Sequence, residues 1–566
     1  MAVHYRARQP GNCCRTHRLR RRRRRVGRRS LLARGEAELL RGRLGRSDYR
    51  TAGFRRVRRA PGARGQRPNR DLPGGRFPMG NRRCGRFTGR RNRAGVAAPR
   101  PQQGVAVTSI AIVNASVGLH DDQTVLIDRG VVVGIFDGHI LPKATTTIDA
   151  LGGAVLPGLW DHHVHLHASA ARKRSVDVSG VRDIRDFAEV LLKAAGEVRP
   201  GEWVRVVGYN DGKLGELESR RLHELVPTEI PMRVQHRGGH QWVLNPAGAR
   251  VLAEAAGREV PADGVLWEDD TLLHLLAGSR PSAAELKAEV RHLVQQGCVG
   301  ATDMTATTGS EAAEALLCAA QDVLNLQLFG SPDPEGWRSK APAWLNGAKI
   351  VISDHKLPPP EGLQNQILAS RPLPVAVHAV TASALALAAW AFSGEVRVGD
   401  RIEHAFLASS GLIGELAQRG LFIGAHPGFI WSQGDRLLQQ LEEDEIPDYQ
   451  KLRTWHRAGT RLLGGTDMPF ATENLWRAMQ SAVDRRTSGG RLINAQEALS
   501  PEEAFAMFTK DGLHGRAKAP VLGLGDVADL CVIDRPWRQA RKDLATVRAK
   551  ATIHSGVIRW RSSGWD

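Results

Sequence analysis

The sequence predicts an α/β protein: a (β/α)8 barrel of the TIM type with an insertion, plus a small β-sandwich domain formed from both ends of the ordered chain. Short apolar runs alternate with longer amphipathic stretches from residue 159 to about residue 510, a pattern typical of strand–helix units around a parallel sheet. About 350 residues in such units fit a closed barrel with insertions. Strand-like segments without helices lie on both sides of this region, which indicates the second domain.

The first hundred residues differ sharply from the rest in charge. They contain 32 Arg, no Lys and four acidic residues, a net +28, so the remainder of the chain, with a total of +21, carries −7. Such a segment buries too little apolar surface to become ordered, and residues 1–104 are predicted to be disordered. An arm for nucleic acid or a membrane surface, or a targeting peptide, would be functional interpretations. We favour a third, an upstream region translated from too early a start, with Met79, Val105 or Val107 as the true start.

Cysteine usage and hydropathy limit the class of protein further. Cys298, Cys318 and Cys531 are scattered through the body of the chain without CxxC spacing, which fits reduced thiols in the cytoplasm. No stretch approaches the roughly 18 apolar residues of a membrane-spanning helix. We therefore expect a cytoplasmic enzyme with a small-molecule substrate and without a nucleic-acid or membrane partner, and the sequence leaves open whether it forms a homo-oligomer.

The small β-domain is predicted from two separate segments, 105–157 and 516–566. In the first, residues 107–113 and 123–136 are rich in β-branched residues and are bounded by polar turns at Asp121-Asp122 and Asp137-Gly138. The second segment contains three further apolar runs, at 529–534, 547–554 and 557–560.

The barrel is predicted over 158–515, interrupted by an insertion at about 203–276. Its apolar runs include 349–353, 374–378, 421–425 and 461–465, and its helical stretches include 181–195, 283–296, 309–319, 381–393 and 502–509. Further apolar runs at 203–207 and 232–235 fall within the insertion. Gly238-Gly239 could act as a hinge there, and Trp242 could line the substrate pocket, so we interpret the insertion as a lid or pocket wall that excludes water.

The first chemical signal is the histidine pair His163 and His165, at the end of an apolar run that follows Pro157-Gly158. Alternating side chains on a strand place both imidazoles on one face, and histidine is the commonest metal ligand. His167 falls on the same face. The pair alone fits a histidine-rich strand end with satisfied side chains equally well.

Four more residues of ligand type lie at later strands of the predicted barrel, and they strengthen the metal interpretation. Lys349, His378, His404 and Asp467 are separated by 29, 26 and 63 residues. The first two gaps correspond to one strand–helix unit each and the third to about two units. Because the carboxyl ends of barrel strands share one mouth, all six residues are expected to meet there.

This set resembles the pattern of the amidohydrolase superfamily, in which HxH follows strand one, Lys or another anionic bridge lies on strand four, His on strands five and six, and Asp on strand eight. The resemblance covers about 107–560 and is closer to the deacylase-like branch that includes formamide deformylases. Three stretches support it: HQWVLN at 240–245, GCVGATDM at 297–304 and GLGDVADL at 523–530. It implies a divalent metal, as one or two ions per chain, bound by His163, His165, Lys349, His378, His404 and Asp467. Nitrogen and oxygen ligands of this kind favour zinc, with manganese and iron as alternatives.

The resemblance also implies that Lys349 is carboxylated. A protonated ammonium cannot bind a metal and its reference pKa is about 10.4, whereas a carbamate formed with carbon dioxide is an anionic oxygen ligand. A strand-end lysine that simply reaches solvent is the alternative. Lys356, in a proline-rich turn, is a weaker candidate for the same role.

Two positions depart from the pattern of this branch. The branch usually has Gly-Asp soon after the strand-five histidine, where this chain has Val380-Thr381-Ala382, and a Gln-Pro pair where it has His426-Pro427. Both positions line the substrate mouth in the family. We therefore name His426, with His240 and Trp242, as candidate substrate-binding residues.

The expected activity is hydrolysis of a non-peptide carbon–nitrogen bond in an amide, an N-acyl compound, a formamide or a cyclic amide. The metal would lower the pKa of a bound water to about 7, Asp467 would act as general base, and His240 could help polarise the carbonyl. A buried structural role for His240 is equally compatible with the sequence.

Other functions stay open at this point. A deaminase or esterase could use the same barrel, and one ion without a bridging lysine would favour deamination. A nucleic-acid-binding protein driven by the arginine-rich segment would bind with a steep salt dependence, and an inactive barrel would have lost at least one ligand position.

Overall fold

The computed structural model describes residues 109–199, 201–239, 241–257, 259–267, 280–331, 343–353, 356–509 and 521–563. All of them belong to one compact unit of the chain, Arg100–Asp566; the other unit is Met1–Pro99. The disordered segment and the start sites predicted within 1–107, and the candidate residue His240, lie outside the described residues.

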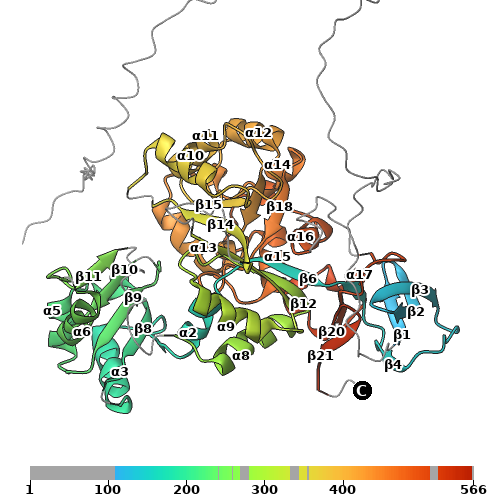
Figure 1. The fold of residues 1–566 in the computed structure, drawn as a ribbon, viewed down its shortest axis with the longest axis horizontal. Coiled ribbons are helices and arrows are strands. Elements are labelled where there is room, and N and C mark those ends of the chain that lie inside the picture. Colours follow the sequence, from blue (N-terminus) through green and yellow to red (C-terminus); the bar gives the residue numbers. More distant parts are fainter. Residues whose placement is uncertain are drawn as a thin grey trace, which may run out of the picture. The chain divides into compact units, whose positions relative to one another are not determined.

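An eight-stranded parallel sheet forms the centre of the unit and confirms the predicted barrel (Figure 1). Its strands, in spatial and sequence order, are β6 (Leu159–Val164), β12 (Cys298–Asp303), β13 (Asn325–Gly330), β14 (Leu345–Val351), β15 (Val375–Ala379), β16 (Arg401–His404), β17 (Phe422–Ala425) and β18 (Arg461–Gly464). Every residue of β6, β12, β16 and β17 is buried. Strands covered on both faces tend to be continuous apolar runs, and β14, β15, β17 and β18 correspond to apolar runs in the sequence; β6 and β16 differ because they carry buried charged residues and histidines.

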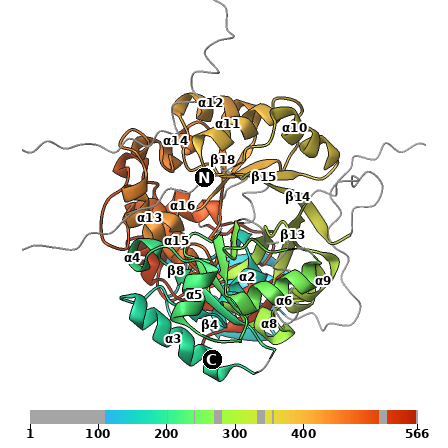
Figure 2. The same ribbon diagram turned by 90° about the vertical axis from the view of Figure 1, so that its left-hand side faces the viewer.

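Helices surround the strands. They are α2 (Leu166–Lys173), α8 (Ala283–Val294), α9 (Ser310–Ala320), α10 (Pro360–Ala369), α11 (Ala382–Ala391), α12 (Ser410–Arg419), α13 (Gly428–Gln440), α14 (Leu452–Arg457), α15 (Leu475–Asp484) and α16 (Pro501–Met507). Two of them, α8 and α16, begin with a capping box in which a serine and a glutamate three residues later satisfy the first backbone amides. The helices α10, α11, α12 and α14 lie along the outside of β14–β18 (Figure 1, Figure 2).

The barrel closes where the first strand meets the segment that follows the last one. The backbone amide of Asp467 donates to the carbonyl of His163 (2.8 Å), and the amide of His165 donates to the carbonyl of Met468 (3.0 Å). The buried Asp161 carboxylate also accepts hydrogen bonds from the Thr466 hydroxyl (2.6 Å) and amide (3.0 Å). We call this contact the closure seam.

Two four-stranded sheets form the small β-domain. One has the order β3-β2-β1-β4, from β1 (Ile110–Val117), β2 (His120–Asp128), β3 (Val131–Asp137) and β4 (Thr146–Asp149). The other has the order β21-β20-β19-β5, from β5 (Val155–Pro157), β19 (Leu530–Ile533), β20 (Ala549–His554) and β21 (Val557–Arg561). Apolar residues from both sheets share one core, so the sandwich joins distant parts of the sequence, as predicted.

One predicted strand is divided in the structure. The run 123–136 contains a turn at Arg129 (φ 48°) and Gly130 (φ 78°), which separates β2 from β3. Two successive residues with positive φ make the tight turn that fits the twist of a hairpin. Apolar alternation continues on both sides, so the sequence pattern alone hides this turn.

The insertion between α2 and α8 has its own sheet, with the order β11-β10-β9-β8-β7. Its strands are β7 (Val176–Asp177), β8 (Val204–Tyr209), β9 (Met232–His236), β10 (Gln241–Leu244) and β11 (Val265–Trp267), and its main helices are α3 (Ile184–Glu197), α5 (Ser219–Leu225) and α6 (Pro246–Ala256). The predicted start at about residue 203 is therefore wrong, because β7 and α3 already belong to this layer. Strand–helix periodicity cannot separate such a layer from barrel units.

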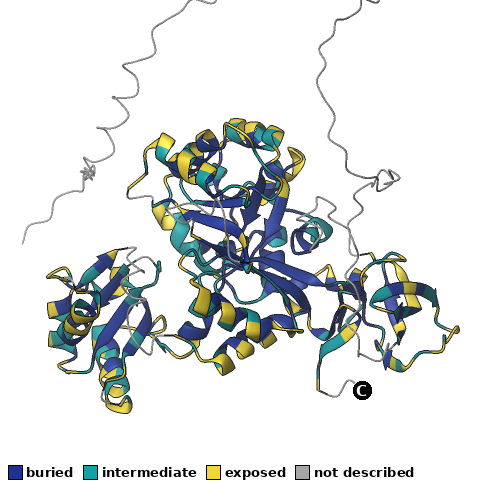
Figure 3. Cartoon of the chain, viewed as in Figure 1, coloured by how far each residue is buried: buried dark blue, intermediate teal, exposed yellow. Residues whose placement is uncertain are grey.

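Burial follows the layers (Figure 3): the barrel strands are buried, while the outer faces of the surrounding helices are exposed. In the described part of the chain, no helix is long and apolar enough to cross a membrane.

Candidate metal centre

The end of β6 places His163 and His165 in contact. Their Nε2 atoms are 3.3 Å apart; His163 is fully buried, and 18% of the His165 side chain is exposed. The other nitrogen of each ring is held: His163 Nδ1 lies 2.6 Å from Glu403 Oε2, and His165 Nδ1 lies 3.0 Å from the Thr305 hydroxyl. Both Nε2 atoms are thereby directed to the same point.

Asp467 reaches that point from beyond β18. Its Oδ1 atom lies 3.3 Å from His165 Nε2 and 3.7 Å from His163 Nε2. A tetrahedral ion with bonds of about 2.0–2.1 Å separates its ligand atoms by roughly 3.3–3.4 Å. The spacing of the three side chains therefore fits a divalent ion bound between them.

Three further imidazoles lie beside this group. All three lie at the carboxyl ends of strands: His378 is the last residue but one of β15, His404 is the last residue of β16, and His426 directly follows β17. The ring centroid of His404 is 4.4 Å from those of His378 and His426, and that of His426 is 4.5 Å from that of His163. His163, His404 and His426 form a second group in which ligand atoms lie within 4.8 Å of one another.

The fully buried imidazoles of His163, His404 and His426 favour the neutral form, which can offer a lone pair. Burial holds the pKa of His163 and of His404 well below the ordinary value, and neighbouring cationic groups lower them further. Burial also lowers the pKa of His426 to about 3. Neutral imidazole is the form that binds metals.

Lys349 on β14 belongs to the same cluster. It is buried, and its Nζ atom has no hydrogen-bond partner among the described residues. Burial lowers its pKa to about 8, so a larger fraction of neutral amine is present near neutral pH than for an exposed lysine. The rival candidate Lys356 is exposed.

Glu403 and Arg401 also belong to the site, although they were not predicted from the sequence. Both are fully buried on β16, with Arg401 Nε 2.8 Å from Glu403 Oε1. Burial acts to raise the pKa of Glu403, but Arg401 and Lys349 outweigh it and hold the pKa below its ordinary value. The signal was available, since two charged residues in a four-residue strand that is buried on both faces need a partner or a function.

Space for the Glu403 carboxylate comes from a glycine on the next strand. A Cβ atom at Gly424 would lie 2.0 Å from Glu403 Oε2. Any larger residue would displace the carboxylate that holds His163 Nδ1.

The backbone turns sharply at two candidate ligands. His404 and Asp467 have positive φ angles of 72° and 52°. Residues other than glycine rarely adopt this conformation, and they do so preferentially at functional sites, where the surrounding contacts offset the strain.

Two candidate substrate residues have different outcomes in the structure. Trp242 is buried on β10, with Arg205 and Arg233 over its ring at 5.1 and 5.2 Å, inside a separate apolar cluster of the insertion. The ring of Trp242 therefore packs in the core of the insertion, and its contact with substrate stays a prediction. His426 instead lies inside the imidazole cluster.

The insertion approaches the cluster through the turn between β9 and β10. A Cβ atom at Gly239 would lie 3.0 Å from the Phe470 ring, whose centroid is 5.5 Å from that of His165. The residue after Gly239 is His240, which lies outside the described residues. His167 is directed elsewhere, with Nε2 3.1 Å from the Ala312 carbonyl.

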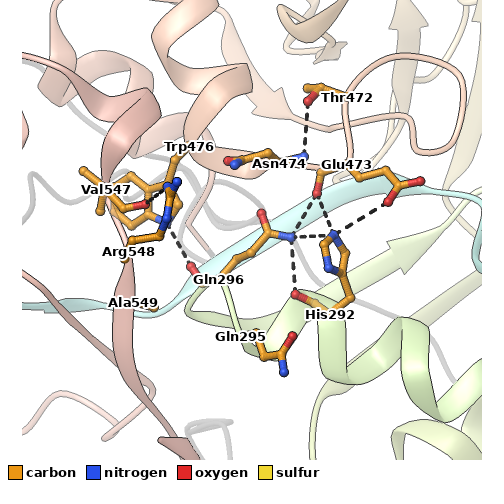
Figure 4. Close-up of a pocket in the computed structure, with 10 residues that line it drawn as sticks. All are labelled: His292, Gln295, Gln296, Thr472, Glu473, Asn474, Trp476, Val547, Arg548 and Ala549. Carbon is orange, nitrogen blue, oxygen red and sulfur yellow. Dashed lines mark hydrogen bonds and ion pairs between the residues drawn. The ribbon is translucent and has the colours of Figure 1, made fainter. Parts of the chain in front are cut away.

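A surface pocket lies elsewhere and contains none of these residues (Figure 4). Its lining comes from the end of α8, the start of α15 and the start of β20, and includes His292, Gln296 and Glu473. Gln296 Nε2 donates to the Glu473 carbonyl (2.9 Å), and His292 Nε2 lies 3.2 Å from the same oxygen. These polar groups hold one another, so we assign the pocket a structural role.

Comparison with known proteins identifies the family. The model of the amidohydrolase family matches residues 146–343 and 366–559. The N-substituted formamide deformylase of Arthrobacter pascens is 25% identical over 538 residues, which cover 80% of this chain and 99% of that protein.

Solved structures agree on the fold. A metal-dependent hydrolase from Pyrococcus horikoshii OT3 superposes with a TM-score of 0.60 and 19% identity, over 75% of this chain and 97% of that one. One from Pyrococcus furiosus gives 0.57 and 20%, over 75% and 99%. The chain therefore belongs to the amidohydrolase family and is a hydrolase of non-peptide carbon–nitrogen bonds, as its sequence predicted.

Proposed function

We propose that the chain hydrolyses the carbon–nitrogen bond of an N-substituted formamide or a related N-acyl or cyclic amide, with water activated at the cluster around His163. The similarity to a formamide deformylase along nearly all of that protein supports this substrate class. The observation that carries the proposal is the group His163, His165 and Asp467, whose ligand atoms are spaced by 3.3–3.7 Å.

We infer two neighbouring ions. His163, His165 and Asp467 would hold one, and Lys349, His378 and His404 a second. Imidazole nitrogen and carboxylate oxygen are ligands that zinc prefers, so zinc is the ion that we propose. When bound, such an ion lowers the pKa of a coordinated water and polarises the substrate carbonyl.

Asp467 is the proposed general base. Its Oδ1 atom faces His163 and His165, and its Oδ2 atom lies 3.9 Å from His404 Nδ1. A carboxylate between the two groups can take the proton of the attacking water and deliver it to the leaving nitrogen.

Lys349 is the proposed bridge between the ions, as a carbamate. A buried amine with a pKa of about 8 and without a hydrogen-bond partner in the described part of the chain is suited to react with carbon dioxide. This residue favours amide hydrolysis by two ions over deamination by one.

Aromatic side chains form an apolar boundary for the proposed substrate. The ring centroids of Phe406 and Phe429 lie 5.3 and 6.4 Å from that of His404, and Phe470 lies beside His165. Such a boundary limits the access of water and suits an amide with an apolar substituent on nitrogen.

Metal analysis followed by a substrate panel tests the proposal. Purified protein should contain about two zinc ions per chain and should release formate from N-substituted formamides, release a carboxylic acid from N-acyl amino acids, or open the ring of cyclic amides. Removing the metal with a chelator should abolish this release, and adding zinc and bicarbonate should restore it. Activity that persists in metal-free protein would refute the proposal.

A further inference from the structure

The imidazole of His426 is buried, and among the described residues it has no hydrogen-bond partner. The residue directly follows β17, and its side chain is fully buried. Neither ring nitrogen has a hydrogen-bond partner among the residues that the structure describes. Buried polar groups in proteins are nearly always paired, so an unpaired imidazole needs an explanation.

The nearest acid does not supply that partner. Glu403 Oε2 lies 3.6 Å from His426 Nε2, which is too long for a hydrogen bond. The same oxygen is already engaged by His163 Nδ1 at 2.6 Å. The Glu403 carboxylate therefore contacts His163 Nδ1 and forms no hydrogen bond with His426.

The ring of His426 instead faces other imidazoles. Its centroid lies 4.4 Å from that of His404 and 4.5 Å from that of His163. Gly465 permits this approach, because a Cβ atom there would lie 2.6 Å from His163 Cβ and 3.1 Å from His426 Cδ2. His163, His404 and His426 have ligand atoms within 4.8 Å of one another. Both nitrogens of His163 already face other groups, Nδ1 toward Glu403 and Nε2 toward His165 and Asp467, so His404 and His426 are the two imidazoles of this group that are left for a neighbouring cation.

We propose that His426 is a metal ligand contributed by the seventh barrel strand, which acts with His404 to hold the ion next to the one bound by His163, His165 and Asp467. The inference rests on the proposed function, because it requires the metal centre described there. A seat rich in imidazole nitrogen selects zinc, cobalt, nickel or copper over magnesium and calcium, which prefer oxygen ligands.

The test replaces His426 by glutamine, which is close in size but a poor ligand for these ions. Metal-free wild type, His426→Gln, His163→Gln and His167→Gln proteins are titrated with Co²⁺, and bound ions are counted by mass spectrometry while the visible d–d absorption is followed. His426→Gln should lose one ion per chain or bind it at least tenfold more weakly, with a changed spectrum. His167→Gln removes a nearby imidazole outside the cluster and should match the wild type.

The outcomes separate the inference from the function on which it rests. If His163→Gln loses metal while His426→Gln keeps the wild-type number of ions, affinity and spectrum, the metal centre stands and His426 is not a ligand. If His163→Gln also binds as the wild type does, the proposed centre itself is refuted. Reduced turnover of His426→Gln with unchanged metal binding would assign the residue to substrate and overturn the inference.

A measurement on the wild type covers the case in which the variant fails to fold. Crystals loaded with zinc or cobalt locate each ion by anomalous scattering. We expect one ion at about 2.0–2.1 Å from a ring nitrogen of His426, the usual zinc–imidazole bond length. Ions that all lie beyond bonding distance from both nitrogens would refute the inference.

Discussion

The imidazole cluster and the surface pocket of Figure 4 both combine histidine with acidic residues, but they differ in how far their polar atoms are hydrogen-bonded within the protein. In the pocket, Gln296 and His292 share the Glu473 carbonyl, and Gln296 Oε1 also accepts from the Leu475 amide at 2.8 Å. In the cluster, Lys349 Nζ and both nitrogens of His426 have no hydrogen-bond partner among the described residues. Paired polar groups stabilise the fold, whereas buried unpaired groups that lie together, as in the cluster, point to a ligand that would pair with them.

The largest expected effect is on turnover, at Asp467. Asp467→Asn keeps the size of the side chain but removes the proposed general base, so kcat should fall by about 10²–10⁴-fold. Steady-state kinetics with metal content measured on the same sample checks this. His292→Gln, in the surface pocket, is the matched control and should retain wild-type kcat; unchanged turnover in metal-loaded Asp467→Asn would remove Asp467 from the mechanism.

The next effect is on metal affinity and folding, at Glu403. Glu403→Gln weakens the hold on His163 Nδ1 and should weaken metal binding by about 10–100-fold. It also leaves Arg401 buried without its anion, at a cost of about 3–5 kcal/mol in the free energy of unfolding.

A second substitution separates these two consequences of losing Glu403. Arg401→Met combined with Glu403→Gln removes the unpaired charge, so stability in chemical denaturation should recover while metal affinity stays low. Recovery of both would mean that Glu403 does not position His163.

Lys349 should make the free energy of unfolding depend on pH, which can be measured on metal-free protein in buffer without carbon dioxide. Its pKa is about 8 in the folded chain against an ordinary 10.5. Below pH 8 both states carry the proton; between pH 8 and 10.5 only the unfolded state does, so the free energy of unfolding rises with pH, by roughly 3 kcal/mol in all. Lys349→Met should lack this rise, and equal pH slopes for the two proteins would contradict the assignment.

The smallest effect is expected in the surface pocket. Gln296→Ala removes hydrogen bonds at the junction of α8 and α15 and should cost about 1 kcal/mol in the free energy of unfolding, measured in denaturant. Its kcat should equal that of the wild type. A large loss of activity would mean that the pocket contributes to the reaction. It would contradict the assignment of a structural role to the pocket and a chemical role to the imidazole cluster.

The barrel and the positions of the six candidate ligands followed from the sequence, because parallel strands buried on both faces leave apolar runs and their carboxyl ends must converge. Two predicted boundaries were wrong, the undivided strand at 123–136 and the start of the insertion, because each depends on structural detail that hydrophobic periodicity does not contain. The turn at Arg129 and Gly130 rests on backbone angles, and the start of the insertion at β7 rests on which strands pair.

Side-chain contacts between distant strands were also out of reach of the sequence. The role of Glu403 depends on a 2.6 Å contact with His163, 240 residues away. Trp242 shows the opposite case: an aromatic beside a candidate histidine pointed to a substrate contact, but two arginines cover its ring within the insertion.

The closure seam has a consequence for biosynthesis. His163 and His165 emerge from the ribosome about 300 residues before Asp467, and the three side chains meet only when the Asp467 amide reaches the His163 carbonyl. An ion bound by all three, as proposed, would also tie the last strand to the first and would stabilise the closed form by the free energy of its binding. Metal supply during synthesis would therefore govern the yield of folded protein as well as its activity.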